Sequence, residues 1–316
     1  MFEAAKDLVK KSNKIYIVGH INPDGDAIGA ACAMCLALRK MGKDASVICP
    51  SVADCFLFLP KFQEQIGVIE SEYDLLICVD SGNIERLAID VSDFEKAKKV
   101  LLLDHHQISR PCGDINCIRA DLPATCELVY NFLQVLDVEM DCEIATYLYT
   151  GIMTDTGSFN YASTRPSTMY IVSKLFEQGI DFSDICQRLN HTIKEEKLKL
   201  VAKTIDNMEV YFDGKLRYSY VDQKEISNIG ILDEDAEGMT NYLRDVEGTE
   251  VAIHVRQRID GTNKVSIRSA GKVDVANIAI AFGGGGHARA SGFVMPGEYM
   301  ETKKELINMV EVMLKC

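Results

Sequence analysis

Short apolar runs alternate with helical stretches along the first part of the chain. Four runs are continuously apolar rather than alternating, at residues 14–20, 44–49, 74–81 and 100–105. Such runs are typical of parallel strands that are covered on both faces. Helices are expected between and after them, over residues 26–41, 54–62, 123–136, 143–155, 166–178 and 181–189. This alternation of strands and helices predicts an α/β fold built on a parallel sheet.

The pattern changes near residue 190. A charged stretch over residues 191–207 is typical of a connecting helix. Beyond it, Asp213-Gly214 and Asp260-Gly261 each separate two short β-rich runs, which predicts two hairpins. We therefore expect a first domain over residues 1–190, a helical linker over 191–210 and a smaller mixed α+β domain over 211–316.

Composition narrows the class of protein. The chain has 316 residues, of which 47% are hydrophobic and 26% charged, and its formal net charge is −13. This charge excludes the broad basic surface of a protein that coats long duplex nucleic acid. The longest apolar run, Ala27–Leu38, is too short to span a bilayer, and the first dozen residues lack the apolar core of a signal peptide. Eleven scattered cysteines favour reduced thiols, and hence a cytoplasmic protein.

Histidine and aspartate recur where predicted elements end. His20, Asp24 and Asp26 follow the first strand, the place where open α/β sheets bind ligands. The alternative is that an aspartate there only caps the next helix. Three more groups have the same character: Asp80 in Val79–Gly82, the triplet Asp104-His105-His106, and Asp155 in Ile152–Ser158. Each group alone fits a turn or a cap, but four recurrences in one domain favour a common site.

The residue types indicate a metal site. Imidazole and carboxylate without cysteine suit Mn²⁺ and related octahedral ions rather than structural zinc. Asp24, Asp26, Asp80 and Asp155 would repel one another if they were packed together without cations. Two divalent ions would neutralise them, and a two-metal site of ~3.5–4 Å spacing activates a water for in-line attack on phosphorus. The predicted chemistry is therefore phosphoester hydrolysis.

A local basic excess marks the second domain. Residues 250–292 carry three acidic and six basic side chains, the latter being Arg256, Arg258, Lys264, Arg268, Lys272 and Arg289. A strand arginine can hold a phosphate by its bidentate fork, and a glycine run lets backbone N–H groups approach an anion. We predict a clamp on the remote end of a substrate, formed by Arg268, His287, Gly284, Gly285 and Gly286, with Arg256 and Arg289 as further candidates. The alternatives are solvated arginines and a flexible glycine loop.

Two other patterns do not indicate function. Cys32-x-x-Cys35 has no second pair to complete a zinc site, which favours core packing. Gly283-x-Gly285-x-x-Ala288 matches a dinucleotide-binding fingerprint but follows a helical stretch rather than a strand, so we reject that interpretation. The lone His191 and His254 are expected to be structural.

Taken in order, His-x-x-Pro-Asp-Gly-Asp, Asp-Ser-Gly, Asp-His-His and Thr-Asp-Thr-Gly resemble the motifs of the DHH phosphoesterase superfamily. The run of four glycines and His287 resembles the signature of its accessory DHHA1 domain. The resemblance implies two metal ions, most simply Mn²⁺, with Mg²⁺ or Co²⁺ as alternatives. It assigns His20 and Asp24 to one ion, Asp26, His105 and Asp155 to the other, and Asp80 to both. His106 would face the scissile phosphate, and Asp104 would orient a neighbouring imidazole.

Length and layout are similar to the branch of this superfamily that contains short-RNA oligoribonucleases. The resemblance implies hydrolysis of RNAs a few nucleotides long and of 3′-phosphoadenosine 5′-phosphate (pAp), with the substrate held between metals and clamp. Hydrolysis of linear or cyclic dinucleotides, such as pApA, stays open as an alternative. A non-catalytic nucleotide sensor would lack part of the cluster, and no cluster residue is missing. We expect no long duplex and no membrane partner, and a homodimer stays open.

Overall fold

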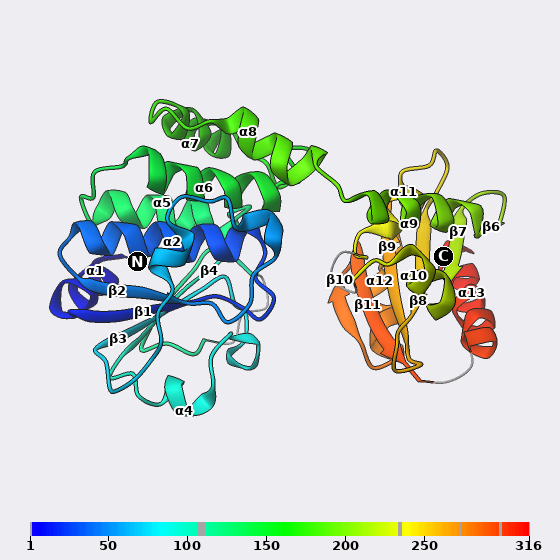
Figure 1. The fold of residues 1–316 in the computed structure, drawn as a ribbon, viewed down its shortest axis with the longest axis horizontal. Helices are drawn as coiled ribbons and strands as arrows, with labels where there is room; N and C mark the ends of the chain where they lie inside the picture. Colours follow the sequence, from blue (N-terminus) through cyan, green and yellow to red (C-terminus); the bar gives the residue numbers. More distant parts are fainter. Residues whose placement is uncertain (1, 107–110, 233–235, 272, 297–298, 316) are drawn as a thin grey trace. The chain divides into compact units, whose positions relative to one another are not determined.

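The computed structural model describes residues 2–106, 111–232, 236–271, 273–296 and 299–315. It divides into two compact units, residues 1–192 and 193–316 (Figure 1). Each unit has its own sheet and its own hydrophobic core. Within the described residues, no helix combines the length and the apolar character needed to cross a membrane.

The first unit is built on a parallel five-stranded sheet in the order β2-β1-β3-β4-β5. The strands are β1 (Lys14–Val18), β2 (Asp44–Ile48), β3 (Leu75–Val79), β4 (Val100–Asp104) and β5 (Ile115–Ile118). The first four coincide with the predicted strands, and the central β3 and β4 are buried along their whole length. We did not predict β5, because its four residues include an asparagine and only Cys117 is buried.

Helices cover one face of this sheet in layers (Figure 1). α2 (Gly25–Lys40), α5 (Thr125–Val135) and α6 (Cys142–Asp155) share a buried core with β1 and β4. The remaining helices are α1 (Phe2–Lys11), α3 (Phe62–Gln65), α4 (Val91–Phe94), α7 (Pro166–Phe176) and α8 (Phe182–Cys186). The helix expected over residues 54–62 is wrong: a 3₁₀ turn spans Asp54–Phe56, and α3 begins only after Pro60. Proline lacks the N–H that a continuous helix needs there.

The second unit contains a mixed six-stranded sheet in the order β10-β11-β9-β8-β7-β6. Among the described strands of this second sheet, β7 and β8 are the one parallel pair. The two predicted hairpins are confirmed as antiparallel pairs, and Asp213 and Gly214 both have positive φ in the first turn. The strands are β6 (Met208–Tyr211), β7 (Leu216–Val221), β8 (Val251–Gln257), β9 (Asn263–Ser269), β10 (Gly285–His287) and β11 (Ala290–Met295). The predicted combination of a parallel-sheet domain with a mixed domain is thus confirmed.

Helices pack on both faces of the second sheet. α12 (Val275–Ala281) and α13 (Tyr299–Lys315) lie on one face, and α9 (Glu195–Asp206), α10 (Gln223–Ile229) and α11 (Met239–Arg244) on the other. α9 is the helix that we expected as a linker. It belongs to the second unit instead, because Leu200 and Val201 are buried in a cluster with residues of β7, α10 and α11.

Candidate metal centre and substrate face

The predicted metal-binding side chains meet at the carboxyl edge of the first sheet. β1 and β3 end immediately before a motif and β4 ends on Asp104, so the neighbouring parallel strands bring these motifs together. The nitrogen and oxygen atoms lie within 4.8 Å of one another in three groups: His20–Asp24–Asp80, Asp26–His105–Asp155 and Asp80–His105–His106. The structure therefore unites all six predicted metal ligands and His106.

Asp80 lies between the two predicted metal positions. Its Oδ2 is 3.8 Å from His20 Nε2, while its Oδ1 is 3.5 Å from His105 Nε2. His105 Nε2 is also 3.3 Å from Asp155 Oδ2 and 4.0 Å from Asp26 Oδ2. One carboxylate oxygen thus faces each group, which is the placement that a bridging ligand needs.

The two imidazoles are oriented by backbone carbonyls. His20 Nδ1 lies 2.9 Å from the carbonyl oxygen of Ile21, and His105 Nδ1 lies 3.2 Å from that of Leu122. An Nδ1–H that donates to a carbonyl leaves Nε2 as the unprotonated nitrogen. In both rings Nε2 is the atom that faces the carboxylates, so this donor set fits divalent cations.

The loop after β1 holds Asp24 by helix capping. Asp24 Oδ1 accepts hydrogen bonds from the N–H groups of Asp26 and Ala27, at 3.0 and 3.1 Å. The same oxygen is 3.7 Å from His20 Nε2. The capping role considered from the sequence is therefore present, and it places the carboxylate beside the histidine.

Asp26 is held by the beginning of α5. The backbone N–H groups of Thr125 and Cys126 donate to its Oδ2 and Oδ1, at 2.6 and 2.9 Å. Thr125 Oγ1 also donates to Asp80 Oδ1 at 2.9 Å. The first N–H groups of a helix have no partner inside the helix and attract a carboxylate. Thr125 thus contacts both buried carboxylates, Asp26 through its backbone N–H and Asp80 through its hydroxyl.

Close packing of α2 against α6 brings Asp26 near Asp155. A Cβ on Gly151 of α6 would lie 2.3 Å from Cys126 Sγ and 2.9 Å from Asp26 Oδ1. Only glycine allows this approach. Asp80 itself has a φ of +52°, a strained conformation that turns the chain sharply at the end of β3.

Burial and mutual repulsion disfavour the ionised form of the clustered carboxyl groups. Burial raises the pKa of Asp26 well above its ordinary value, and the charges of Asp80 and Asp155 add to the effect. Burial likewise raises the pKa of Asp80, with Asp24 contributing, and raises that of Asp155 to about 6, although His105 offsets part of this shift. Divalent cations would remove this penalty by pairing with the ionised carboxylates.

Asp104 and His106 form a separate pair. Asp104 is fully buried, and its Oδ1 lies 2.7 Å from His106 Nδ1 and accepts the backbone N–H of His106 at 3.3 Å. This hydrogen bond raises the pKa of His106, although burial of the ring opposes the shift. The pair fixes the direction of the His106 ring at the edge of the cluster.

In the second unit, two of the predicted clamp residues, Arg268 and His287, lie in one row across the sheet. Arg268 of β9 pairs with Ala290 of β11, and Ala290 pairs with His287 of β10. Directly paired residues share a face of the sheet, so the arginine and the histidine flank a small alanine. The structure therefore places Arg268 and His287 on the same face of the sheet, one strand apart.

The remaining clamp candidates differ in exposure. Arg256 is buried, whereas Arg289 is exposed. Gly285 and Gly286 belong to strand β10 and Gly284 precedes it, so the alternative of a flexible loop does not describe this segment. A Cβ on Gly284 would lie 2.3 Å from the carbonyl oxygen of Gly292, which explains why a side chain is missing there. Lys272 of the predicted basic set lies outside the described residues.

Comparisons with known proteins identify the family of this chain. Residues 14–152 match the DHH family, N-terminal domain, and residues 213–315 match the DHHA1 domain. A protein of Thermus thermophilus, "Bifunctional oligoribonuclease and PAP phosphatase NrnA", is 32% identical over 287 residues, which cover 90% of this chain and 84% of that protein. The chain belongs to the DHH family.

Solved structures resemble this DHH-family chain over nearly its whole length. An exopolyphosphatase-related protein from Bacteroides fragilis is 28% identical, with a TM-score of 0.88 over 99% of this chain and 95% of that one. A structure of exonuclease RecJ bound to manganese is 14% identical, with a TM-score of 0.55 over 96% of this chain and 92% of that one. The second likeness shows the fold alone.

Sequence reasoning missed the groups that support the DHH-family motifs. Thr125 and Cys126 act through their backbone N–H groups and Leu122 through its backbone carbonyl, and backbone atoms carry no side-chain signal in the sequence. One signal was available for the first two: a helix was predicted over residues 123–136, and the first N–H groups of a helix attract a carboxylate.

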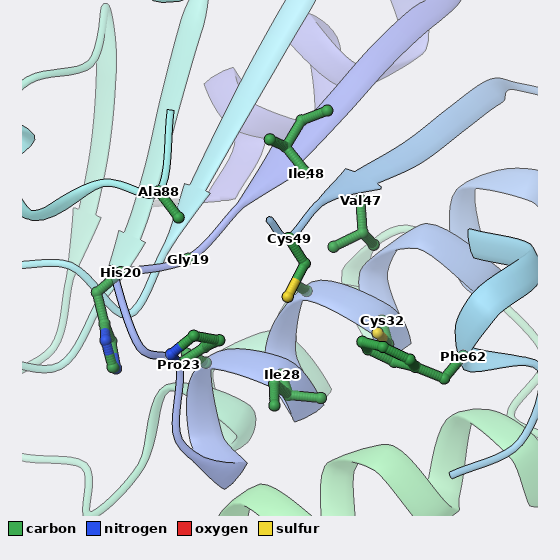
Figure 2. A pocket seen from close by; sticks show the side chains of 12 residues that line it. Gly19, His20, Pro23, Ile28, Cys32, Val47, Ile48, Cys49, Phe62 and Ala88 are labelled. Carbon is green, nitrogen blue, oxygen red and sulfur yellow. The ribbon is translucent and has the colours of Figure 1, made fainter. Parts of the chain in front are cut away.

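A small apolar pocket lies beside the metal cluster (Figure 2). His20 stands at one end of its lining, next to Gly19 and Pro23, and Cys32 of α2 and Phe62 of α3 lie at the other (Figure 2). The expected core role of the Cys32-x-x-Cys35 pair is confirmed, because Cys32 and Cys35 are both fully buried. Apolar side chains of this pocket therefore border the metal cluster at His20.

Proposed function

We propose that this chain is a phosphoesterase that uses two divalent cations, foremost Mn²⁺, to hydrolyse RNAs a few nucleotides long and to dephosphorylate pAp. The observation that carries the proposal is the pair of groups His20–Asp24 and Asp26–His105–Asp155, with one oxygen of Asp80 facing each. The T. thermophilus relative is named for both activities, and it covers most of the chain.

The chain's own residues prepare the reaction. Bound at the two groups, the cations would supply Lewis acidity toward a phosphate oxygen and lower the pKa of an attacking water. Thr125 and Cys126 hold Asp26 in one orientation, so its oxygens need not reorganise. Asp104 fixes the Nδ1–H of His106, which leaves His106 Nε2 to hold a proton for the leaving group.

The second unit supports the choice of a short substrate. Arg268 and His287, in one row of the sheet, are the groups that would bind a phosphate distant from the reacting one. Their row is local, and the chain as a whole carries a net charge of −13. Long nucleic acid would instead require a broad basic surface.

We further infer a cytoplasmic protein, because the cysteines of the described residues are free thiols.

A substrate panel tests this proposal. Chelated protein is reloaded with Mn²⁺ and given pAp, pApA, a five-nucleotide RNA, a twenty-nucleotide RNA and pyrophosphate, and kcat/KM is measured for each. We expect pAp and the short RNA to exceed the long RNA by about 100-fold or more, about 2.7 kcal/mol in transition-state binding. Asp80→Asn should be inactive on all of them, and an exposed control, Glu72→Gln, should retain activity.

Three results would change the conclusion. Equal activity on the long RNA, or full activity after chelation, overturns the proposal. A strong preference for pApA over both pAp and the short RNA favours the dinucleotide phosphodiesterase that the sequence left open. Metal-dependent binding of pAp without any turnover identifies a sensor rather than an enzyme.

A further inference from the structure

The chain makes an unusual turn just after Asp155, the last residue of α6. Gly157, Ser158 and Phe159 have φ values of +56°, +55° and +67°, so three successive residues are left-handed. Glycine adopts this conformation freely, whereas a side chain raises its energy. Ser158 and Phe159 therefore keep it only because other contacts hold them in place. We call residues 157–159 the left-handed turn.

Local hydrogen bonds supply part of that support. Thr156 Oγ1 accepts the N–H of Phe159 at 3.1 Å, and Asn160 Nδ2 donates to the carbonyl oxygen of Ser158 at 3.2 Å. The N–H of Ser158 in turn donates to the carbonyl oxygen of Met153 at 2.8 Å. The left-handed turn is thus bonded to the helical turn that carries the predicted metal ligand.

A second support comes from a residue 32 positions further along the chain. Asn190 Nδ2 donates to Ser158 Oγ at 2.9 Å and lies 4.0 Å from Met153 Sδ. Cys186 Sγ lies 3.3 Å from the same Met153 sulfur. These side chains therefore contact the chain on both sides of Asp155, before the end of α6 and within the left-handed turn.

The backbone around Asn190 has a rare form. Gln187–His191 is a π-helical turn that follows α8, and Thr192 Oγ1 donates to the carbonyl oxygen of Gln187 at 3.1 Å. Such turns are uncommon and occur frequently at functional sites. The first unit ends at Thr192. The last turn of this unit is therefore the element that holds Asn190 against Ser158.

We propose that Asn190 is a positioning residue for the metal ligand Asp155. By holding Ser158 in the left-handed conformation, it keeps the end of α6 intact. The Asp155 carboxylate then stays beside His105, whose Nε2 lies 3.3 Å from Asp155 Oδ2. The inference rests on the proposed function and deepens it, because it concerns the ion predicted at Asp26, His105 and Asp155.

The test follows one Mn²⁺-binding event in calorimetry of chelated protein. That event is the one that is lost in Asp155→Asn and retained in Asp24→Asn. Asn190→Ala removes the donor to Ser158, and because Asn190 is exposed, its replacement leaves the core intact. Asn228→Ala is the matched control, since Asn228 is exposed on α10 of the second unit.

Ser158→Gly provides the background that separates positioning from general stabilisation. Glycine adopts a φ of +55° without support, so the turn no longer needs Asn190. We expect Asn190→Ala to weaken the followed event about 5-fold in the parent protein, the effect of one lost hydrogen bond between neutral groups. Ser158→Ala loses the same bond and keeps the strain, so it should do likewise. In the Ser158→Gly background, Asn190→Ala should leave the affinity nearly unchanged, as Asn228→Ala should in both.

Activity gives a second readout. A more weakly bound ion is restored by raising its concentration, so Asn190→Ala should need about 5-fold more Mn²⁺ for half-maximal hydrolysis of pAp. At saturating Mn²⁺ its kcat should equal that of the parent protein. A fall in kcat that saturating Mn²⁺ does not restore would contradict the positioning role.

The outcomes separate this inference from the proposed function. If the parent protein neither binds Mn²⁺ nor hydrolyses a phosphoester, the proposed function fails. If it does both, and Asn190→Ala weakens the followed event equally in the parent and the Ser158→Gly background, or in neither, Asn190 does not position Asp155. An Asn190→Ala protein that loses helical content is replaced by Asn190→Leu, which keeps the size of the side chain and removes its donor, with the same expected result.

Discussion

Removal of divalent cations should make the first unit less stable as the pH rises. Burial raises the pKa of Asp155 from 3.8 to about 6, and the pKa values of Asp26 and Asp80 are raised as well. Each carboxyl then binds more protons in the folded state than in the unfolded state. The stability that this binding contributes is complete below about pH 4 and is lost as the pH rises through about 6.

The size of the effect follows from the shift at Asp155. A difference of about 2 pKa units, at about 1.4 kcal/mol per unit, corresponds to about 3 kcal/mol. The side chain is 31% exposed, so solvent screening makes this figure an upper limit. Asp26 and Asp80 act in the same direction, and bound cations reverse the effect because they favour the ionised carboxylates.

Urea unfolding of chelated protein from about pH 4.5 to about pH 7.5 measures the effect. Far-UV circular dichroism is the suitable probe, since the chain has no tryptophan. Asp155→Asn cannot titrate, so the parent protein should lose up to about 2 kcal/mol relative to this variant across the range. Glu72→Gln controls for the change of charge. A parent protein that gains stability relative to Asp155→Asn as the pH rises would refute the reasoning.

Two substitutions test the supports of the metal centre. Thr125→Val removes the hydroxyl donor to Asp80 and should weaken Mn²⁺ binding by about 10-fold in calorimetry, because Asp80 loses a hydrogen bond that orients it. Thr125→Ser keeps the hydroxyl and should bind Mn²⁺ as the parent protein does. Equal affinities for both variants would contradict this role of Thr125. Gly151→Ala forces a methyl group to within 2.3 Å of Cys126 Sγ and should cost about 1–3 kcal/mol in unfolding free energy. Gly271→Ala, where a Cβ meets no atom within 4 Å, should cost much less, and a similar loss in both variants would rule out the packing argument.

Much of the catalytic unit was predictable because its signals are local. Continuous apolar runs identify the four long strands, and the charged motifs stand immediately after three of them. Parallel strands end at one edge, so these three motifs were expected to lie at the same edge of the sheet. Short or irregular pieces were not predictable. β5 has a single buried residue, and the break at Pro60 depends on one proline within an otherwise helical stretch.

The sequence by itself determined the chemistry of the protein: which residue types can hold a metal, that they follow strands, and that a basic, glycine-rich segment accompanies them. Only the tertiary structure decided their mutual geometry. It turned the two oxygens of Asp80 toward different histidines, placed the N–H groups of Thr125 and Cys126 on Asp26, and packed α9 into the second unit. These contacts join residues far apart in the chain or use backbone atoms, which every residue possesses, so no side-chain pattern records them.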